Sequence, residues 1–319
     1  MLTTWLHPRQ AARTLLALAA TLALASCGGG GSDAKKSAAG GDLKGDAEAL
    51  TKQAAGPNAK ARTGVVDGKV TLKLAGLPGY PEFSAGVSGP YSYRKGAALP
   101  DYELELGARD YGVGLTSVGG RSYVSLGSTA YRMPAAVRRR LIASSAKGAN
   151  GLTRTLEQFG IAPWRWETDK RIAGTDRIDG VEVVRVRTSA EVGRILRDAN
   201  TLLGFMTSLG LARATGLPRE IGPAARRAIV HNVTSFSASS WIGVKDHVLR
   251  RSGFTMRFSV PAAERSKVAG ITGGTVVGLL EVSEVGRPHP IAAPETIGDI
   301  ADFEVGIDAV GDAQEASRG

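Results

Sequence analysis

The chain has 319 residues, a formal net charge of +10 from 40 Lys and Arg against 30 Asp and Glu, and a single cysteine. With 43% hydrophobic residues, it is too apolar for a disordered polyanion and lacks the composition of a collagen. One cysteine excludes an internal disulfide and a zinc site built from cysteines, so this residue needs a separate explanation.

The N-terminal segment has the features of a secretory signal. His7, Arg9 and Arg13 precede an apolar run from Leu15 to Ala25. This run of about 11 residues is too short to cross roughly 30 Å of hydrocarbon as a helix, which excludes a transmembrane span. We therefore interpret residues 1–26 as a signal peptide.

The segment Leu24-Ala25-Ser26-Cys27 resembles the bacterial lipobox. The resemblance implies that the Cys27 thiol receives a diacylglycerol, that the peptide is cut before it, and that the new N-terminus can be acylated. The alternative is an ordinary cleavable signal with a chance cysteine. Two or three acyl chains, at about 0.8 kcal/mol per buried CH₂, would hold the protein on a membrane. We predict Cys27 as the lipidation site, on the extracytoplasmic face of the cell membrane.

Export also limits what the basic charge can mean. The signal contains Arg9 and Arg13 and no acidic residue, which leaves 38 basic and 30 acidic residues, or +8. Nucleic acid is not an expected partner outside the membrane. The excess either attracts the domain to anionic lipid headgroups, within a screening length of about 8–10 Å, or only keeps an arginine-rich domain soluble.

Residues 28–41 read GGGGSDAKKSAAGG and contain no large apolar side chain. A Gly/Ser segment of this length is a flexible coil with an end-to-end distance of roughly 20 Å. The predicted organisation is therefore a signal peptide at 1–26, a lipidated cysteine and tether at 27–41, and a single domain at 42–319, without a second linker or an internal repeat.

The first part of the domain reads as a short helix followed by an antiparallel meander. The helix is predicted over Asp46–Ala55. Apolar and polar residues then alternate with period two at Val70–Leu74, Tyr102–Leu106 and Val113–Leu115, as in strands with one buried face. Gly119-Gly120 predicts a two-residue hairpin turn before the next strand.

The middle of the domain changes to helical spacing. Helices are predicted over Pro134–Ile142 and over Leu152–Phe159, and a strand over Val181–Val186. Thr188 and Glu191 form a T-x-x-E pattern, which predicts a capping box. The helix behind it carries an apolar stripe that must be buried, and the sheet is the only large partner; its residues are Val192, Ile195, Leu196, Ala199, Leu202, Leu203 and Met206.

Strands return from Val233 onward, first over Val233–Val244, then over His247–Val260 and over Val276–Val285. The order of strands, helices and strands predicts an α+β fold with helices gathered on one face of an antiparallel sheet. Ser235, Ser237 and the small residues up to Ser240 either leave room in the core or face solvent.

The sequence contains no catalytic constellation. G-x-S-x-G is absent, and no phosphate-binding glycine loop follows a strand and opens a helix. His231, His247 and His289 are far apart and lack metal-ligand spacing. We expect no enzyme activity, no metal and no cofactor. Asp246-His247 and the stretch Asp176 to Gly180 read as turns.

Two further patterns have an ordinary and a functional interpretation. Trp164 and Trp166 after Pro163 fit packing at the rim of the sheet better than the cover of a cavity mouth. Arg138, Arg139 and Arg140 fit a solvated helix face better than a site for phosphate headgroups.

Three segments resemble the LppX/LprAFG family of actinobacterial cell-envelope lipoproteins. They are GGRSYVSL at 119–126, IDGVEVV at 178–184, and the hairpin from Trp241-Ile242-Gly243 to Arg250-Arg251. The resemblance, which also extends to the LolA/LolB-like lipoprotein carriers, implies a strongly curved antiparallel half-barrel whose concave face is covered by helices that enclose a hydrophobic cavity. The segments 134–159 and 209–229 are longer than the family pattern.

The function implied by this resemblance is a membrane-anchored carrier of acyl lipid or glycolipid across the cell envelope. The alternative is a lipid-anchored interaction or sensor module without a lipid cargo. A monomer is expected, and an envelope transporter is a candidate partner. The cavity lining is predicted from one face of the strands and of the long helix: Val70, Leu72, Leu74, Leu104, Leu106, Val113, Leu115, Leu196, Leu203 and Met206.

Overall fold

The computed structural model describes residues 43–56, 61–76, 82–94, 96–108, 111–144, 151–209, 219–268 and 270–316. Residues 1–42 lie outside the described residues. The signal peptide, the lipidated Cys27 and the tether therefore stay predictions.

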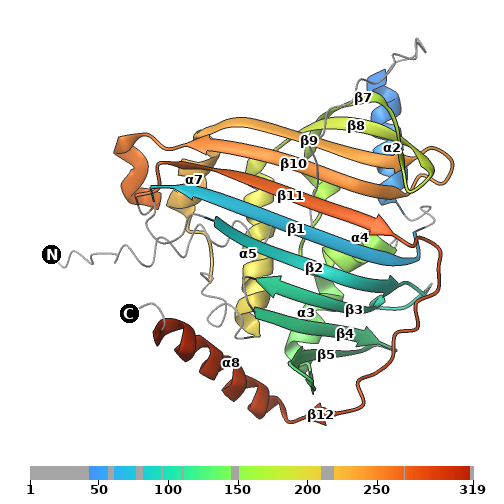
Figure 1. Ribbon diagram of the computed structural model, residues 1–319, viewed down its shortest axis with the longest axis vertical. Coiled ribbons are helices and arrows are strands. Elements are labelled where there is room, and N and C mark those ends of the chain that lie inside the picture. The colour runs from blue at the N-terminus through green and yellow to red at the C-terminus, as the bar shows by residue number, and fades with distance from the viewer. Residues whose placement is uncertain are drawn as a thin grey trace.

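The described residues form one sheet of twelve strands in the order β12-β6-β5-β4-β3-β2-β1-β11-β10-β9-β8-β7 (Figure 1). All neighbours are antiparallel except β12 and β6. The order ends at β12 and β7, so the sheet is open and is not closed into a barrel. The strands are β1 (Thr63–Ala75), β2 (Glu82–Ser92), β3 (Asp101–Ala108), β4 (Tyr111–Val118), β5 (Arg121–Leu126), β6 (Thr129–Arg132), β7 (Glu167–Ile178), β8 (Val181–Ala190), β9 (Val233–Gly243), β10 (Leu249–Ser259), β11 (Gly273–Ser283) and β12 (Ile297–Gly298).

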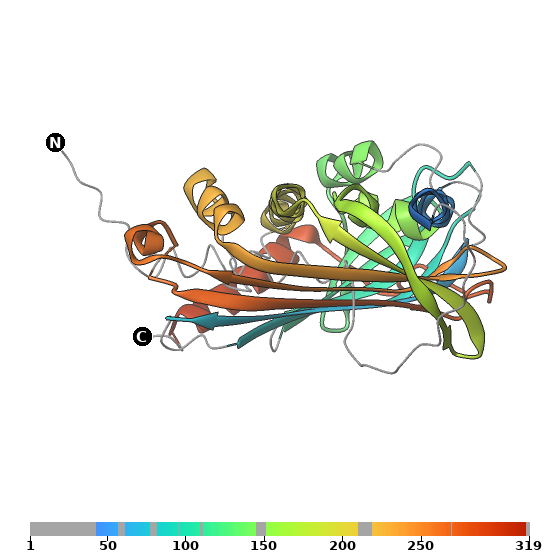
Figure 2. The same ribbon diagram turned by 90° about the horizontal axis from the view of Figure 1, so that it is seen from above.

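Five helices lie on the same side of this sheet (Figure 2). They are α2 (Leu43–Ala55), α3 (Ala135–Ser144), α4 (Gly151–Glu157), α5 (Val192–Ser208) and α7 (Pro223–His231). Two 3-10 helices complete the connections: η1 (Pro163–Arg165) lies between α4 and β7, and η2 (Ala262–Val268) lies between β10 and β11. The last helix, α8 (Ile300–Ala316), packs at the β6 edge, where the ring of Phe303 lies 5.4 Å from that of Tyr131.

The main core lies between the sheet and the helices. Along β1, every second residue from Val66 to Leu74 is buried while the odd-numbered residues between them are more exposed, because alternate side chains of a strand point to opposite faces. Helix α5 buries seven side chains from Ile195 to Met206 on the same core. The predicted α+β class, with an antiparallel sheet and helices over one face, is confirmed.

Several local predictions are also confirmed. Gly119 and Gly120 form the turn between β4 and β5 with φ of 58° and 77°, values that a residue with a side chain rarely adopts. Asp179 and Gly180 likewise turn the chain between β7 and β8 with positive φ, although Asp176 lies within β7.

The predicted capping box is wrong. Thr188 belongs to β8, and Glu191 occupies the N-cap of α5 without a side-chain hydrogen bond to the helix. The Glu191 carboxylate instead forms ion pairs with Arg194, at 2.7 Å, and with Arg197, at 3.4 Å. The guanidinium groups of Arg194 and Arg197 thus compete with the backbone amides at the start of α5 for the carboxylate oxygens of Glu191.

Candidate functional site

The predicted cavity residues come together in one layer. Nine of the ten are buried members of the main apolar cluster, and Leu106 is half-buried and packs against it. β1, β3 and β4 contribute the floor, and α5 lies above it (Figure 1). The register aligns Leu104 with Leu115 and Leu106 with Val113 across β3 and β4. We call the apolar space between the sheet and α3, α4, α5 and α7 the sheet–helix interior.

Aromatic rings that were not predicted as cavity lining connect the layers of this interior. The ring of Phe159 lies 6.1 Å from Tyr102 on β3 and 5.3 Å from Phe205 on α5, both in edge-on geometry. Such pairs stabilise by roughly 0.5–1.5 kcal/mol beyond their buried area. The sequence signal was present in Phe159, at the end of the predicted helical stripe, but its partners depend on the tertiary fold.

The interior also contains buried polar atoms. Tyr91 on β2 is completely buried, and its hydroxyl has no hydrogen-bond partner among the described residues. Burial raises the pKa of the Tyr91 phenol, partly opposed by the charge of Arg250, so the hydroxyl stays protonated. A protonated phenol in an apolar layer can donate a hydrogen bond to an ester or carboxyl oxygen.

A small pocket, the α2 pocket, opens on this interior between α2, α4, η1 and the sheet. Its volume is about 40 Å³. Leu152 and Leu156 of α4, Trp164 of η1 and Leu280 of β11 supply apolar walls. Sites that hold small organic ligands usually measure roughly 300–1,000 Å³, so an acyl chain fits here only if the helices move away from the sheet.

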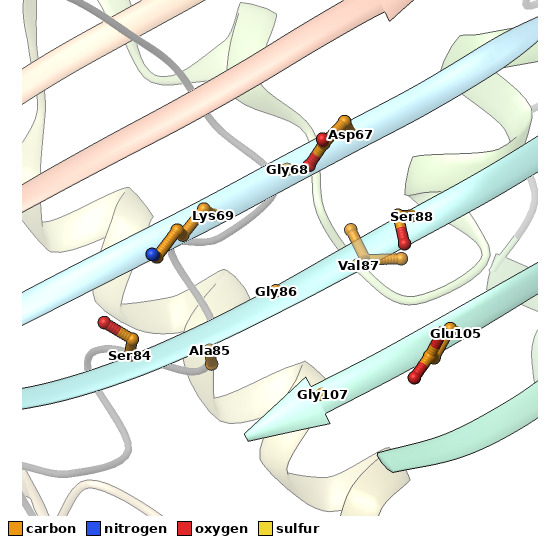
Figure 3. A pocket seen from close by; sticks show the side chains of 10 residues that line it. All are labelled: Asp67, Gly68, Lys69, Ser84, Ala85, Gly86, Val87, Ser88, Glu105 and Gly107. Atoms are coloured by element: carbon orange, nitrogen blue, oxygen red, sulfur yellow. The ribbon is translucent and has the colours of Figure 1, made fainter. Parts of the chain in front are cut away.

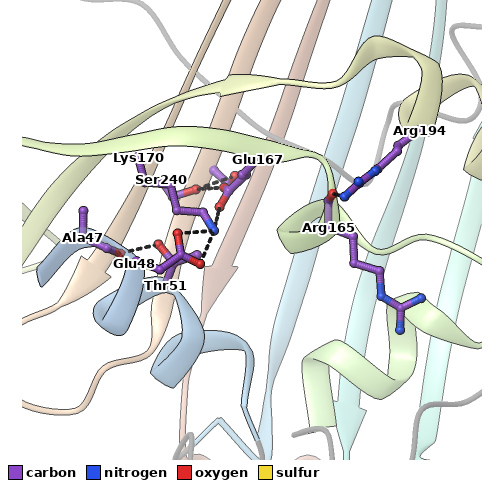
Figure 4. Close-up of polar contacts among 9 residues, drawn as sticks. Ala47, Glu48, Thr51, Arg165, Glu167, Lys170, Arg194 and Ser240 are labelled. Carbon is purple, nitrogen blue, oxygen red and sulfur yellow. Dashed lines mark hydrogen bonds and ion pairs between the residues drawn. The ribbon is translucent and has the colours of Figure 1, made fainter. Parts of the chain in front are cut away.

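One carboxylate lies in the wall of the α2 pocket (Figure 4). Glu167 Oε1 accepts a hydrogen bond from Ser240 Oγ at 3.1 Å. Glu167 Oε2 lies 3.8 Å from Lys170 Nζ, and that ammonium also lies 3.3 Å from the Glu48 carboxylate of α2. Burial raises the pKa of Glu167, against the opposing effects of Lys170 and Ser240. The cluster connects α2 to β7 and places one polar group beside apolar walls.

The opposite face of the sheet has a different groove, of about 370 Å³ (Figure 3). Gly86 and Gly107 are register partners there, and Gly86 also pairs with Lys69 on β1. Because glycine has no side chain, Gly86 and Gly107 leave the backbone of β2 and β3 uncovered between Asp67 and Glu105. The groove is lined by residues of β1, β2 and β3 and includes none of the ten predicted cavity residues.

The tryptophans and the Asp-His pair have definite places. Trp166 is buried and donates a hydrogen bond from Nε1 to Asp198 Oδ2 at 2.8 Å, as expected of a ring that packs at the rim of the sheet. Trp164 instead lines the α2 pocket.

Asp246 accepts a hydrogen bond from the Val248 amide at 3.1 Å and pairs with Arg250, and His247 has a φ of 54°. Asp246-His247 therefore forms the turn between β9 and β10.

Within the described part of the chain, no group of three or more His, Cys, Asp or Glu is arranged to hold a metal ion. Its helices include none that is both long and apolar enough to cross a bilayer.

No family model matches the sequence, and no curated protein matches it. Solved structures do. LprF from Mycobacterium bovis is 14% identical with a TM-score of 0.39, covering 80% of this chain and 99% of its own. The Mycobacterium tuberculosis lipoprotein LppX is 15% identical with a TM-score of 0.35, covering 78% and 99%. A Vibrio parahaemolyticus domain assigned to outer-membrane lipoprotein sorting is 8% identical with a TM-score of 0.22, covering 84% and 99%.

LprF and LppX carry names of the family that the three sequence segments resemble. None of the three similar structures is named as an enzyme. The likeness concerns the fold alone.

Proposed function

We propose that this chain is a lipid-anchored envelope protein that binds acyl lipid or glycolipid in the sheet–helix interior and carries it between membranes. The observation that supports this most is the placement of an almost entirely apolar layer between an open sheet and a set of separate helices. Burial of acyl chains there stabilises the complex by about 25 cal/mol per Å² of apolar surface. Cys27 holds the carrier at the extracytoplasmic face, and the tether lets it reach a partner membrane or transporter.

The test uses residues 28–319, which contain every described helix and strand but not Cys27. A solvent extract of the purified chain should contain co-purified lipid by mass spectrometry, and the delipidated chain should take up a fluorescent fatty acid. A lipid-free extract together with no uptake would reject the carrier.

A matched pair of variants locates the site. Met206→Trp adds volume to the interior beneath α5, whereas Val277→Trp adds it on the opposite face of the sheet, where Val277 is 41% exposed. Uptake should fall in the first variant and stay unchanged in the second. Equal uptake in both variants would place the lipid elsewhere.

A lipid-anchored interaction module without cargo is the alternative, and the small volume of the α2 pocket, about 40 Å³, favours it. In that case the interior is an ordinary filled core, and the same extract would contain no lipid.

A further inference from the structure

The helices of this protein carry their charges unevenly. α3, α5 and α7 together contain seven arginines and one acidic residue, Asp198. α8 contains five acidic residues and no basic one. Since α3, α5 and α7 lie side by side over the sheet (Figure 2), the arginines gather on one side of the molecule.

Some of these arginines are neutralised or engaged within the fold. Arg194 and Arg197 pair with Glu191. Arg138 donates a hydrogen bond to the Gly120 carbonyl at 2.6 Å. These contacts account for three of the seven.

The other four form what we call the arginine face: Arg139 and Arg140 on α3, and Arg226 and Arg227 on α7. None of them forms an ion pair with another described residue. On α3 the neighbouring Val137 and Leu141 point into the core, which leaves Arg139 and Arg140 exposed.

α7 has the same division. Ala225, Ala228 and Ile229 are buried, while Arg227 is exposed and Arg226 half-buried. Val230, beside Arg227 in sequence, is 44% exposed. A basic residue next to an exposed apolar one is typical of protein surfaces that lie at a lipid headgroup layer.

On the opposite face of the sheet, acidic residues accompany the basic ones, and some of them form ion pairs. Lys73 lies 3.1 Å from Glu82, and Arg251 Nε lies 2.7 Å from Glu281 Oε1. The asymmetry therefore belongs to one side of the molecule and not to its composition as a whole.

We propose that the arginine face docks on an anionic lipid bilayer. Guanidinium groups match phosphate oxygens with two parallel hydrogen bonds, and four of them on α3 and α7, which lie on the two sides of α5 (Figure 1), suit an extended surface better than a single small anion. α2 lies on the same side of the sheet (Figure 2). The 15 residues from 28 to 42, which extend to at most about 50 Å, thus join a helix on the docking side. The docking needs neither cargo nor anchor, so its failure leaves the lipid-carrier proposal standing.

The test measures co-sedimentation of residues 28–319 with vesicles of phosphatidylglycerol and phosphatidylcholine, against vesicles of phosphatidylcholine alone. The wild-type chain should bind the anionic vesicles and be released by 1 M salt, which shortens the screening length to about 3 Å. Each arginine near an anionic surface strengthens binding about fivefold, so Arg139→Gln with Arg140→Gln should weaken it about 25-fold.

The matched control is Arg185→Gln with Arg187→Gln on β8. It removes the same charge from the other side of the sheet, since the alternating Val186 packs on Ala47 of α2. Binding of this control should stay within about twofold of wild type, and both double variants should keep the wild-type melting temperature, because surface substitutions change stability little. Equal weakening by both pairs, no binding to anionic vesicles, or binding only to a soluble polyanion such as polyglutamate would each overturn the proposal.

Discussion

Asp198 on α5 is the polar residue that most directly positions this helix relative to the segment before β7. Its Oδ2 accepts two hydrogen bonds, from Trp166 Nε1 at 2.8 Å and from the Ala162 amide at 3.0 Å. Both donor residues are 4% exposed. Asp198→Ala leaves both donors without this acceptor. Since a hydrogen bond to a charged group contributes about 1.5–3 kcal/mol, we expect the free energy of unfolding to fall by about 3–4 kcal/mol.

Urea denaturation measures this change as a lower midpoint with an unchanged m-value. Asp198→Asn keeps an acceptor oxygen in place, and we expect it to cost only about 1 kcal/mol. A double-mutant cycle with Trp166→Phe should give a coupling energy of about 1–2 kcal/mol. Effects that add within about 0.5 kcal/mol, or equal losses for the Ala and Asn variants, would refute the role of this acceptor.

Three other predictions follow from single residues. Gly89→Ala would place a Cβ 2.0 Å from the Glu103 carbonyl oxygen at a φ of 140°, and a thermal melt should show a loss of stability of more than about 2 kcal/mol. Gly119→Ala has open space around its Cβ, and the same measurement should show a loss of about 1 kcal/mol. Burial raises the pKa of Glu167 above 4.5, so the native state binds the proton more tightly than the unfolded state, and the stability from this group is lost as the pH rises through the raised pKa. Glu167→Gln does not titrate, so its free energy of unfolding in urea melts should rise relative to that of the wild type between pH 4.5 and pH 8. A difference that stays constant with pH would contradict this. Cys27→Ser should move the full-length protein out of the salt-washed membrane fraction on an immunoblot, and an unchanged distribution would reject the lipid anchor.

Strands with large residues on one face could be predicted from sequence, and strands without them could not. β1 shows the alternation clearly at Val70, Leu72 and Leu74. β2 was missed because glycines stand at Gly86 and Gly89 and Pro90 follows them, which removes the usual pattern. β7 is an edge strand with mostly exposed or half-buried residues, so its sequence needs no apolar face at all.

The candidate site shows the same limit. The apolar residues of β1, β3, β4 and α5 share one layer because their spacing directs them to one face, and spacing can be read from the sequence. Glu167 and Ser240 are 73 positions apart, and only the pairing of β7, β8 and β9 brings them together. Ser235 and Ser237 proved to face solvent, and β9 lies near the β7 edge, so these serines leave no room in the core.

The helices that cover the sheet differ in how much apolar surface they bury against it. α5 buries seven apolar side chains, and each large one contributes about 1.5–3 kcal/mol, so separating α5 from the sheet is costly. α2 instead packs through Ala47 in a small cluster apart from the main core, and its polar contacts include an ion pair from Glu48 to Lys170 and a hydrogen bond from Thr153 Oγ1 to the Ala55 carbonyl at 3.0 Å. Among the described side chains, α2 buries the apolar Ala47 where α5 buries seven, so displacing α2 exposes less apolar surface than displacing α5 and opens the α2 pocket directly. Under the proposed function, we therefore expect the interior to open at α2 more readily than at α5, and in the sequence α2 directly follows the predicted tether.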